Sequence, residues 1–146
     1  MRVFRHAFDL STRGSTDIID ITPPVREAMG KSGIADGIAI VSTIGSTSSI
    51  TTCEYEPGLE KDLKDIFEKL VPLRGKYAHN SSWGGSDGNA HSHLRASLVG
   101  PSLSLILENG ELLLGTWQQI LFIDFDNRPR RRKVRVQCIG DEKSVY

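Results

Sequence analysis

The chain has 146 residues, which is enough for a substantial core, and we expect a single domain over residues 1–146. Eighteen basic and eighteen acidic residues cancel, so composition gives no general attraction to nucleic acid or to an anionic membrane, and no apolar run is long enough to span one. The first residues lack the apolar core of a secretion signal, and Cys53 and Cys138 are too few for a disulfide framework or a thiolate metal site, so we expect a cytoplasmic protein.

The N-terminal segment predicts two strands and a helix. Residues 2–10 alternate between apolar and polar side chains, which indicates a half-buried strand, and residues 16–21 resume the pattern as a second strand. Thr22 followed by Pro23 is typical of an N-cap and a first helical residue. We expect this helix to end between Gly30 and Gly33.

The next segment predicts strand, loop, strand and helix. Residues 37–44 are mostly apolar, as in an interior strand. Residues 45–49 are all small or hydroxyl-bearing and predict a loop, after which residues 51–53 continue as a strand that Glu54 closes. Residues 59–70 carry apolar side chains at i, i+4, i+7, i+8 and i+11, the clearest amphipathic helix in the chain.

The segment 73–90 has little periodicity, and loops of this length inside a compact domain are usually functional or mobile. It leads into His91 and His93, near the start of a short apolar pattern that stops at Gly100-Pro101. A polar loop that delivers two imidazoles to the start of a short helix is a candidate site.

The last third of the chain predicts strands. Leucine occupies every second position of residues 103–107, and Asn109-Gly110 is a strong signal for a hairpin turn. Residues 112–116 would form the second strand of that hairpin. Residues 117–125 are rich in β-formers, and residues 130–139 alternate basic with apolar side chains. We expect an antiparallel meander here. The whole chain is then an α+β fold, with a large antiparallel or mixed sheet folded as a sandwich and two or three helices.

Three histidines, His79, His91 and His93, lie within fifteen residues and could bind a divalent metal such as zinc or magnesium. Spacing argues against a site that uses all three, because residues 91 and 93 point about 200° apart if both lie on a helix. The alternative is that one of these histidines only caps the helix or faces solvent.

The loop at residues 45–49 could bind an anion, since consecutive backbone N–H groups and hydroxyls, including those of Thr47 and Ser48, form a concave donor surface. It lacks the lysine of a P-loop, and serine-rich turns are common. Glu54 could act as a base or support a neighbouring group, although most glutamates at strand ends are simply solvated.

The basic residues at positions 128–135 raise the question of nucleic-acid binding. They alternate with apolar residues in a chain of zero net charge, so a solvated strand face is favoured over a nucleic-acid surface. One or two of them, Arg130 in particular, could still contact the phosphate of a ligand.

Several short motifs, in this order, resemble those of the YjbQ family. The matches cover nearly the whole chain after residue 36. They are Ser46 to Glu54, Asp62-Leu63, Tyr77-Ala78-His79, Ser92-His93-Leu94-Arg95, Gly100-Pro101-Ser102, Gly115-Thr116-Trp117-Gln118, and Arg130 with Arg131.

The resemblance implies an α+β fold, a homotrimer, and a polar cavity lined by histidines with a glutamate nearby. The activity linked to the family is a secondary one, the condensation of a pyrimidine diphosphate with a thiazole phosphate to thiamine phosphate. Transferred to this chain, the resemblance makes three residues catalytic: Glu54, His79 and His93. Ligand-binding residues would be Thr47, Ser48, Trp117, Gln118 and Arg130, and the ligand a small phosphorylated or anionic molecule.

One departure from the family pattern bears on the reaction. Where the family has its first histidine, this chain has Gly45, and His91 stands where relatives carry a small or apolar residue. The chain therefore lacks a metal ligand or a proton-transfer group. The alternative to an enzyme is a trimer that binds a phosphate or another small anion without turnover.

Overall fold

The computed structural model describes residues 1–82 and 88–142, and it confirms the α+β fold: every strand pair in this part of the chain is antiparallel. One sheet has the order β1 (Arg2–Thr12), β8 (Arg130–Glu142), β3 (Ile34–Thr43), β5 (Ser102–Glu108) and β6 (Glu111–Leu112). The other has the order β2 (Asp17–Asp20), β7 (Gln119–Asp124) and β4 (Ser48–Cys53). The helices are α1 (Thr22–Ser32), α2 (Pro57–Leu70), α3 (Ala78–Ser82) and α4 (Ala90–Val99).

The larger core lies between the two sheets and α1. Val41 of β3 and Val136 of β8 face inward from the five-stranded sheet, and Phe122 of β7 meets them from the three-stranded sheet. α1 adds Val25 and Met29, both fully or almost fully buried. The alternation predicted for β8 is confirmed, because its apolar side chains enter this core while the residues between them stay outside.

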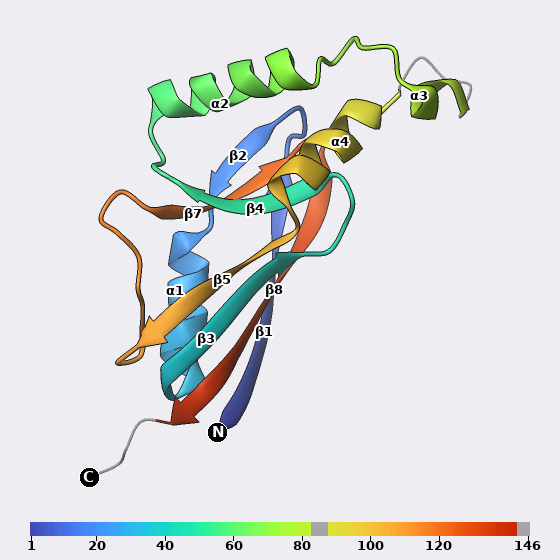
Figure 1. Ribbon diagram of the computed structural model, residues 1–146. Coiled ribbons are helices and arrows are strands. Elements are labelled where there is room, and N and C mark those ends of the chain that lie inside the picture. The colour runs from blue at the N-terminus through green and yellow to red at the C-terminus, as the bar shows by residue number, and fades with distance from the viewer. Residues whose placement is uncertain (83–87, 143–146) are drawn as a thin grey trace.

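The smaller core lies on the other face of the three-stranded sheet, under α2 and α4. Leu121 and Ile123 of β7 point into it, Phe67 comes from α2, and Ala96 from α4. The ring of Phe67 packs edge-on against Phe125, with centroids 4.9 Å apart. Figure 1 shows α2 and α4 lying across β2, β7 and β4 at one end of the molecule.

The last third of the chain is not the predicted meander. Only the hairpin of β5 and β6 joins neighbours in sequence; Asn109 and Gly110 turn it with positive φ values of 53° and 83°. β7 crosses to the other sheet, because its residues are buried on both faces and fit only between two cores. β8 returns to the middle of the five-stranded sheet, between β1 and β3. The described chain also has four helices rather than two or three, α3 having formed in the predicted loop.

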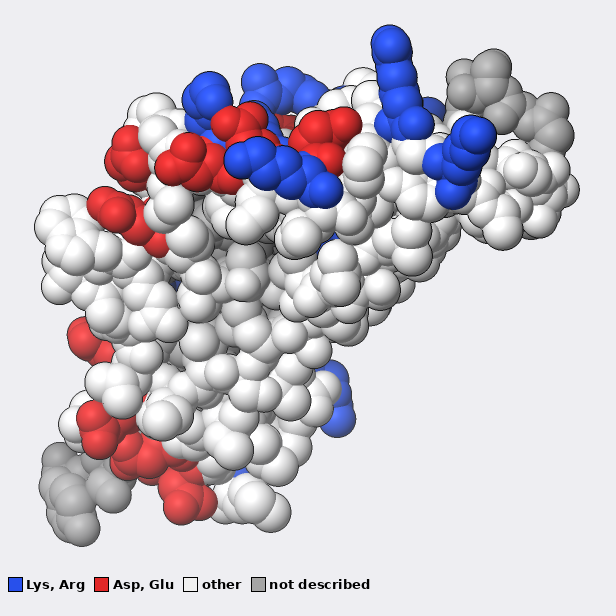
Figure 2. All heavy atoms as spheres, turned by 45° about the horizontal axis from the view of Figure 1, so that its top comes forward, with Lys and Arg blue, Asp and Glu red and all other residues white. Residues whose placement is uncertain are grey.

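The outer face of the five-stranded sheet carries a row of aliphatic side chains, here called the outer row. Backbone register places its four members opposite one another on adjacent strands, and each is 39–58% exposed: Val3, Ile139, Ile38 and Ile106. Figure 2 shows charged side chains gathered over α2 and at the opposite end of this view, with a broad uncharged surface between them.

None of the helices in residues 1–82 and 88–142 is both long and apolar enough to cross a membrane.

Candidate functional site

Two of the predicted site histidines come together. The rings of His79 on α3 and His93 on α4 meet edge-on, with centroids 5.0 Å apart. His79 Nε2 also lies 3.2 Å from Asn89 Oδ1, within hydrogen-bond distance, at the residue that precedes α4. Residues 83–87 of the predicted loop lie outside the described residues, and α3, within the same predicted loop, lies against the start of α4, where the imidazole pair forms.

His91 points away from this pair into the protein. It is 2% exposed, and its Nδ1 has no hydrogen-bond partner among the described residues. Burial lowers the pKa of His91, and the neighbouring Arg95 lowers it further. Both residues lie on α4 and their side chains diverge as the helical spacing predicts, with His91 buried and His93 partly exposed.

The predicted metal set does not form. Within residues 1–82 and 88–142, no three His, Cys, Asp or Glu side chains are grouped so that they could hold a metal ion. His79 and His93 supply two imidazoles, and His91 is turned into the interior. Two neutral ligands are fewer than the three protein ligands of an ordinary catalytic zinc site. These residues alone do not fit zinc or magnesium.

His93 borders a shallow pocket of about 450 Å³, here called the histidine pocket. One wall is the connection between β3 and β4, and the other is the exposed side of α4. Its lining residues are Gly45, Ser46, Ser48, His93, Leu94, Ala96, Ser97 and Pro101. Apart from His93 this lining is small, apolar or hydroxyl-bearing, so the pocket itself carries little charge.

The hydroxyls of the predicted anion loop have partners inside the protein. Thr47 Oγ1 donates to Asp126 at 3.2 Å and accepts from Arg132 at 2.8 Å. Ser48 Oγ lies 2.7 Å from Thr43 Oγ1. Both residues are buried, so this loop holds strands together and offers a ligand fewer hydroxyl donors than its composition indicates.

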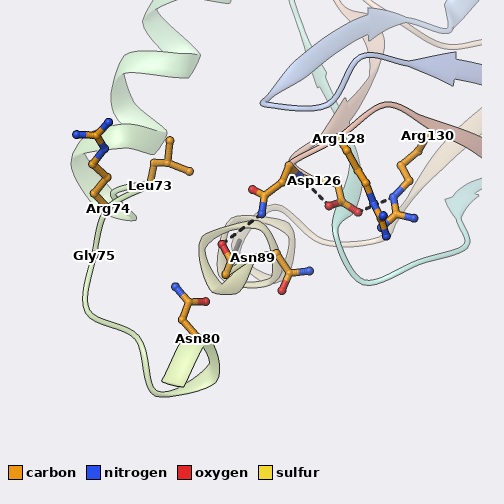
Figure 3. A pocket seen from close by; sticks show the side chains of 10 residues that line it. Leu73, Arg74, Gly75, Asn80, Asn89, Asp126, Arg128 and Arg130 are labelled. Carbon is orange, nitrogen blue, oxygen red and sulfur yellow. Dashed lines mark hydrogen bonds and ion pairs between the residues drawn. The ribbon is translucent and has the colours of Figure 1, made fainter. Parts of the chain in front are cut away.

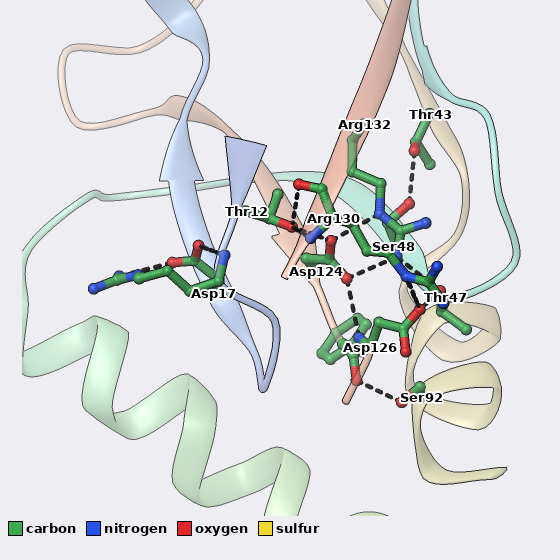
Figure 4. A network of polar contacts seen from close by, with 12 residues as sticks. Thr12, Asp17, Thr43, Thr47, Ser48, Ser92, Asp124, Asp126, Arg130 and Arg132 are labelled. Carbon is green, nitrogen blue, oxygen red and sulfur yellow. Dashed lines mark hydrogen bonds and ion pairs between the residues drawn. The ribbon is translucent and has the colours of Figure 1, made fainter. Parts of the chain in front are cut away.

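A charged network lies below this loop (Figure 4). Arg132 donates to both oxygens of the fully buried Asp124, at 2.7 and 2.8 Å, and Thr12 donates to the same carboxylate at 2.6 Å. The Asp124 contact raises the pKa of Arg132, so this guanidinium stays charged. The basic residues at positions 128–135 were predicted to face solvent. This prediction is correct for Arg131 and Lys133, which are exposed, and wrong for Arg132, whose side chain is 11% exposed.

Three other predicted site residues gather at the far end of β4. Glu54 directly follows this strand and is exposed, while the histidine pocket lies at its beginning. Gln118 Nε2 donates to Thr52 Oγ1 at 3.3 Å, so the loop that carries Trp117 and Gln118 lies near Glu54. A six-residue strand spans about 20 Å. The predicted site is therefore split within one chain, with Glu54, Trp117 and Gln118 apart from the histidine pair.

A cavity of about 830 Å³ was not predicted and is here called the arginine cavity (Figure 3). It lies between the segment after α2, the start of α4 and the turn between β7 and β8. Its lining residues are Leu73, Arg74, Gly75, Asn80, Gly88, Asn89, Asp126, Asn127, Arg128 and Arg130. Of the predicted ligand-binding residues only Arg130 lies here, and it donates to Asp126 at 2.9 Å.

The sequence gives only a partial signal for this cavity. Arg128 and Arg130 belong to the predicted basic run, but Arg74, Asn80 and Asn89 come from segments without periodicity. No spacing rule connects positions so far apart in the chain. Asp126 could have been noticed as a charged residue at the end of an apolar strand, a position that usually requires a buried partner.

Comparison with known proteins adds the family context. A family model described as UPF0047 protein YjbQ-like matches residues 6–141. A UPF0047 protein of Methanothermobacter thermautotrophicus is 40% identical over 140 residues, covering 96% of this chain and 94% of its own length. A second UPF0047 protein, from Methanocaldococcus jannaschii, is 35% identical over 136 residues, with 92% and 94% covered.

Solved structures agree with these relatives. A YbjQ-like protein of unknown function from Sulfolobus solfataricus P2 has a TM-score of 0.89 at 30% identity, covering 96% of this chain and 99% of that one. An uncharacterized conserved protein of the YjbQ/UPF0047 family from Clostridium acetobutylicum has a TM-score of 0.83 at 40% identity, with 92% and 99% covered. The two-sheet fold described above is thus shared over almost the full length of these structures.

Proposed function

The chain belongs to the YjbQ-like UPF0047 family, and on that premise we propose that it acts on a small phosphorylated ligand at the pair formed by His79 and His93. The contact between the two rings, beside the histidine pocket, is the observation that carries the proposal. The reaction is the one that the family resemblance implies, the condensation of a pyrimidine diphosphate with a thiazole phosphate.

In this reaction the thiazole nitrogen attacks the methylene carbon of the pyrimidine, a C–N bond forms, and the C–O bond to the diphosphate breaks. The diphosphate leaves with the bonding electron pair, so its oxygens gain charge in the transition state. Imidazole N–H groups of His79 and His93 can donate to those oxygens and stabilise that charge. Serine hydroxyls and backbone at the pocket edge would orient the substrate.

The test is synthesis of thiamine phosphate from its two precursors by the purified protein. We expect a low but measurable rate for the wild type, and a loss of about a hundredfold or more in His79→Ala and His93→Ala. Leu98→Ala, which shortens an exposed side chain on α4, is the matched control and should keep the wild-type rate. Absence of product from the wild type, or a wild-type rate in both histidine variants, would remove the proposal.

A second candidate function is binding of a phosphate or small anion without turnover, and Gly45 favours it. This residue stands where the family pattern has a histidine, and its φ of 151° is one that L side chains rarely adopt. A Cβ built there would lie 3.3 Å from a guanidinium nitrogen of Arg132. The backbone conformation at position 45 therefore favours glycine. This candidate predicts that phosphate raises the melting temperature while no thiamine phosphate is made.

We also propose that the protein is a homotrimer in the cytoplasm, as the family resemblance implies. Two features support an assembly. The outer row leaves four aliphatic side chains exposed on one sheet face. Glu54 is separated from the histidine pair by the length of β4 within one chain, so the catalytic role expected for it requires a second copy.

A further inference from the structure

We propose that the arginine cavity is a second anion site, separate from the histidine pocket, that takes the phosphate or diphosphate group of a small ligand. This inference does not depend on thiamine phosphate synthesis. It is carried by the charge of the cavity wall, by the donors that the wall presents, and by the size of the cavity.

The cavity wall is positively charged. It contains three arginines, Arg74, Arg128 and Arg130, and one carboxylate, Asp126. Figure 3 shows Arg128 on the turn between β7 and β8, Arg130 at the start of β8, and Arg74 across the cavity on the segment after α2. Within the described part of the chain, neither Arg74 nor Arg128 forms an ion pair, so both charges remain available.

The carboxylate of Asp126 does not cancel the charge of the three arginines, because Arg130 and Arg132 already share it. Asp126 accepts from Arg130 at 2.9 Å and lies 3.5 Å from Arg132, which is outside the cavity lining. Burial acts to raise the pKa of Asp126, but hydrogen bonds from Asn127 and Arg130 outweigh it and the pKa is lowered. Asp126 therefore stays ionised and serves to hold Arg130 in place at the cavity wall.

The remaining polar groups of the wall suit an oxyanion. Asn80 accepts the Ala90 N–H with its Oδ1 at 3.0 Å, which leaves its NH₂ group as a donor. Asn89 precedes α4, so the positive end of this ten-residue helix also meets the cavity. Guanidinium groups bind phosphate through two parallel N–H donors, a geometry that lysine lacks.

The size of the cavity and the pairing of the basic residues beside it favour a small ligand over nucleic acid. A cavity of about 830 Å³ lies within the range of small-molecule sites, about 300–1,000 Å³. The exposed basic residues next along β8 do not extend the positive surface, because Arg131 and Lys133 both pair with Asp9, at 3.3 and 2.8 Å. A polyanion would need a continuous basic track, and the pairing of these two residues with Asp9 interrupts such a track next to the cavity.

The test is calorimetric titration of the full-length protein with inorganic diphosphate, at constant ionic strength. We expect saturable binding that Arg128→Ala and Arg74→Ala each weaken about tenfold or more, the loss of a charge-assisted contact. Arg131→Ala removes the same charge from the neighbouring strand outside the cavity and should bind as the wild type does.

Three results would overturn the inference: no binding by the wild type at millimolar diphosphate, an Arg131→Ala loss equal to that of Arg128→Ala, or displacement of diphosphate by a short oligonucleotide. The assay of thiamine phosphate synthesis gives an independent answer. Binding at the arginines without synthesis supports the second anion site and removes the proposed reaction, whereas synthesis without such binding does the reverse.

Discussion

His91 is buried in a place where a protonated imidazole is unfavourable. It is 2% exposed, its Nδ1 has no partner among the described residues, and its Nε2 lies 3.2 Å from Ser92 Oγ. The charged groups around it are Arg95, Glu68 and Asp126, of which Arg95 opposes a positive imidazole and the two carboxylates favour it. Burial and Arg95 together lower the pKa of His91 below its ordinary value of 6.5.

This gives a prediction for stability against pH. The unfolded chain binds the His91 proton more tightly than the folded chain does, so acid favours unfolding. Stability should be complete above pH 6.5 and should fall as the pH drops from there toward the lowered pKa of the folded state. His91→Gln should flatten this part of the curve. The measurement is the urea midpoint between pH 7.5 and 5.

His6→Gln is the control, since it makes the same substitution at a histidine of β1 that is only partly buried. If His6→Gln flattens the curve as much as His91→Gln does, the acid sensitivity does not come from the helix histidine.

At the scale of single residues, the sequence predicted which neighbouring side chains diverge, but it did not predict which distant side chains come into contact. The helical spacing of residues 91 and 93 correctly predicted that their side chains diverge. It could not predict that His79 would meet His93, because that contact depends on how α3 folds back on α4. Nor could it show that Arg132 turns inward to Asp124, since a strand pattern gives the face but not the partner.

At the scale of elements, one pair of glycines sets how closely β3 and β8 approach. Gly37 and Gly140 are directly opposite, next to an irregularity in the register between Ile34 and Asp36. A Cβ built on Gly140 would lie 2.0 Å from the carbonyl oxygen of Asp36, and one on Gly37 would lie 2.2 Å from that of Ile139. These contacts are with backbone, which cannot move aside without disturbing the sheet.

Gly140→Ala should therefore destabilise the fold, by about 1–3 kcal/mol as in other overpacked sites. Gly30→Ala is the matched substitution with the opposite expected sign. Gly30 lies inside α1, with nothing within 4 Å of its built Cβ, so alanine should stabilise the helix by about 0.5–1 kcal/mol. Urea unfolding of both variants measures the difference. Equal and small effects would mean that β8 can shift away from β3 at no cost.

Elements with strong local periodicity were predictable, and those fixed by tertiary packing were not. α2 spans Pro57–Leu70 where an amphipathic helix was predicted at 59–70. β7 was expected to start at Trp117, yet it begins at Gln119 and leaves Trp117 in a loop, 71% exposed. β-rich composition marks a potential strand, but only the partners β2 and β4 determine where pairing begins.

At the scale of the whole molecule, the outer row predicts self-association. Val3, Ile139, Ile38 and Ile106 form an aliphatic stripe across four strands, and a solvent-exposed stripe of this kind is typical of an interface. We expect light scattering to give the mass of a homotrimer for the wild type. Ile38→Lys should reduce this to the mass of one chain, with an unchanged circular dichroism spectrum.

The control is Leu98→Lys, which places the same charge on an exposed aliphatic residue of α4, away from the outer row. It should keep the wild-type mass. A wild type that runs as a monomer would contradict the trimer. A trimer that survives Ile38→Lys and dissociates with Leu98→Lys would move the interface to α4.

The position of β8 has a consequence for the order in which the protein can fold. β8 is the last strand in the described chain, yet it lies between β1 and β3 in the larger sheet, and β1 pairs with β8 from Arg2↔Gly140 to Thr12↔Arg130. During synthesis β1 must therefore wait for the C-terminal strand to leave the ribosome. Contacts this distant in sequence make sheet closure slow. Until then, the inward faces of β1 and β3 are the surfaces a chaperone would have to protect.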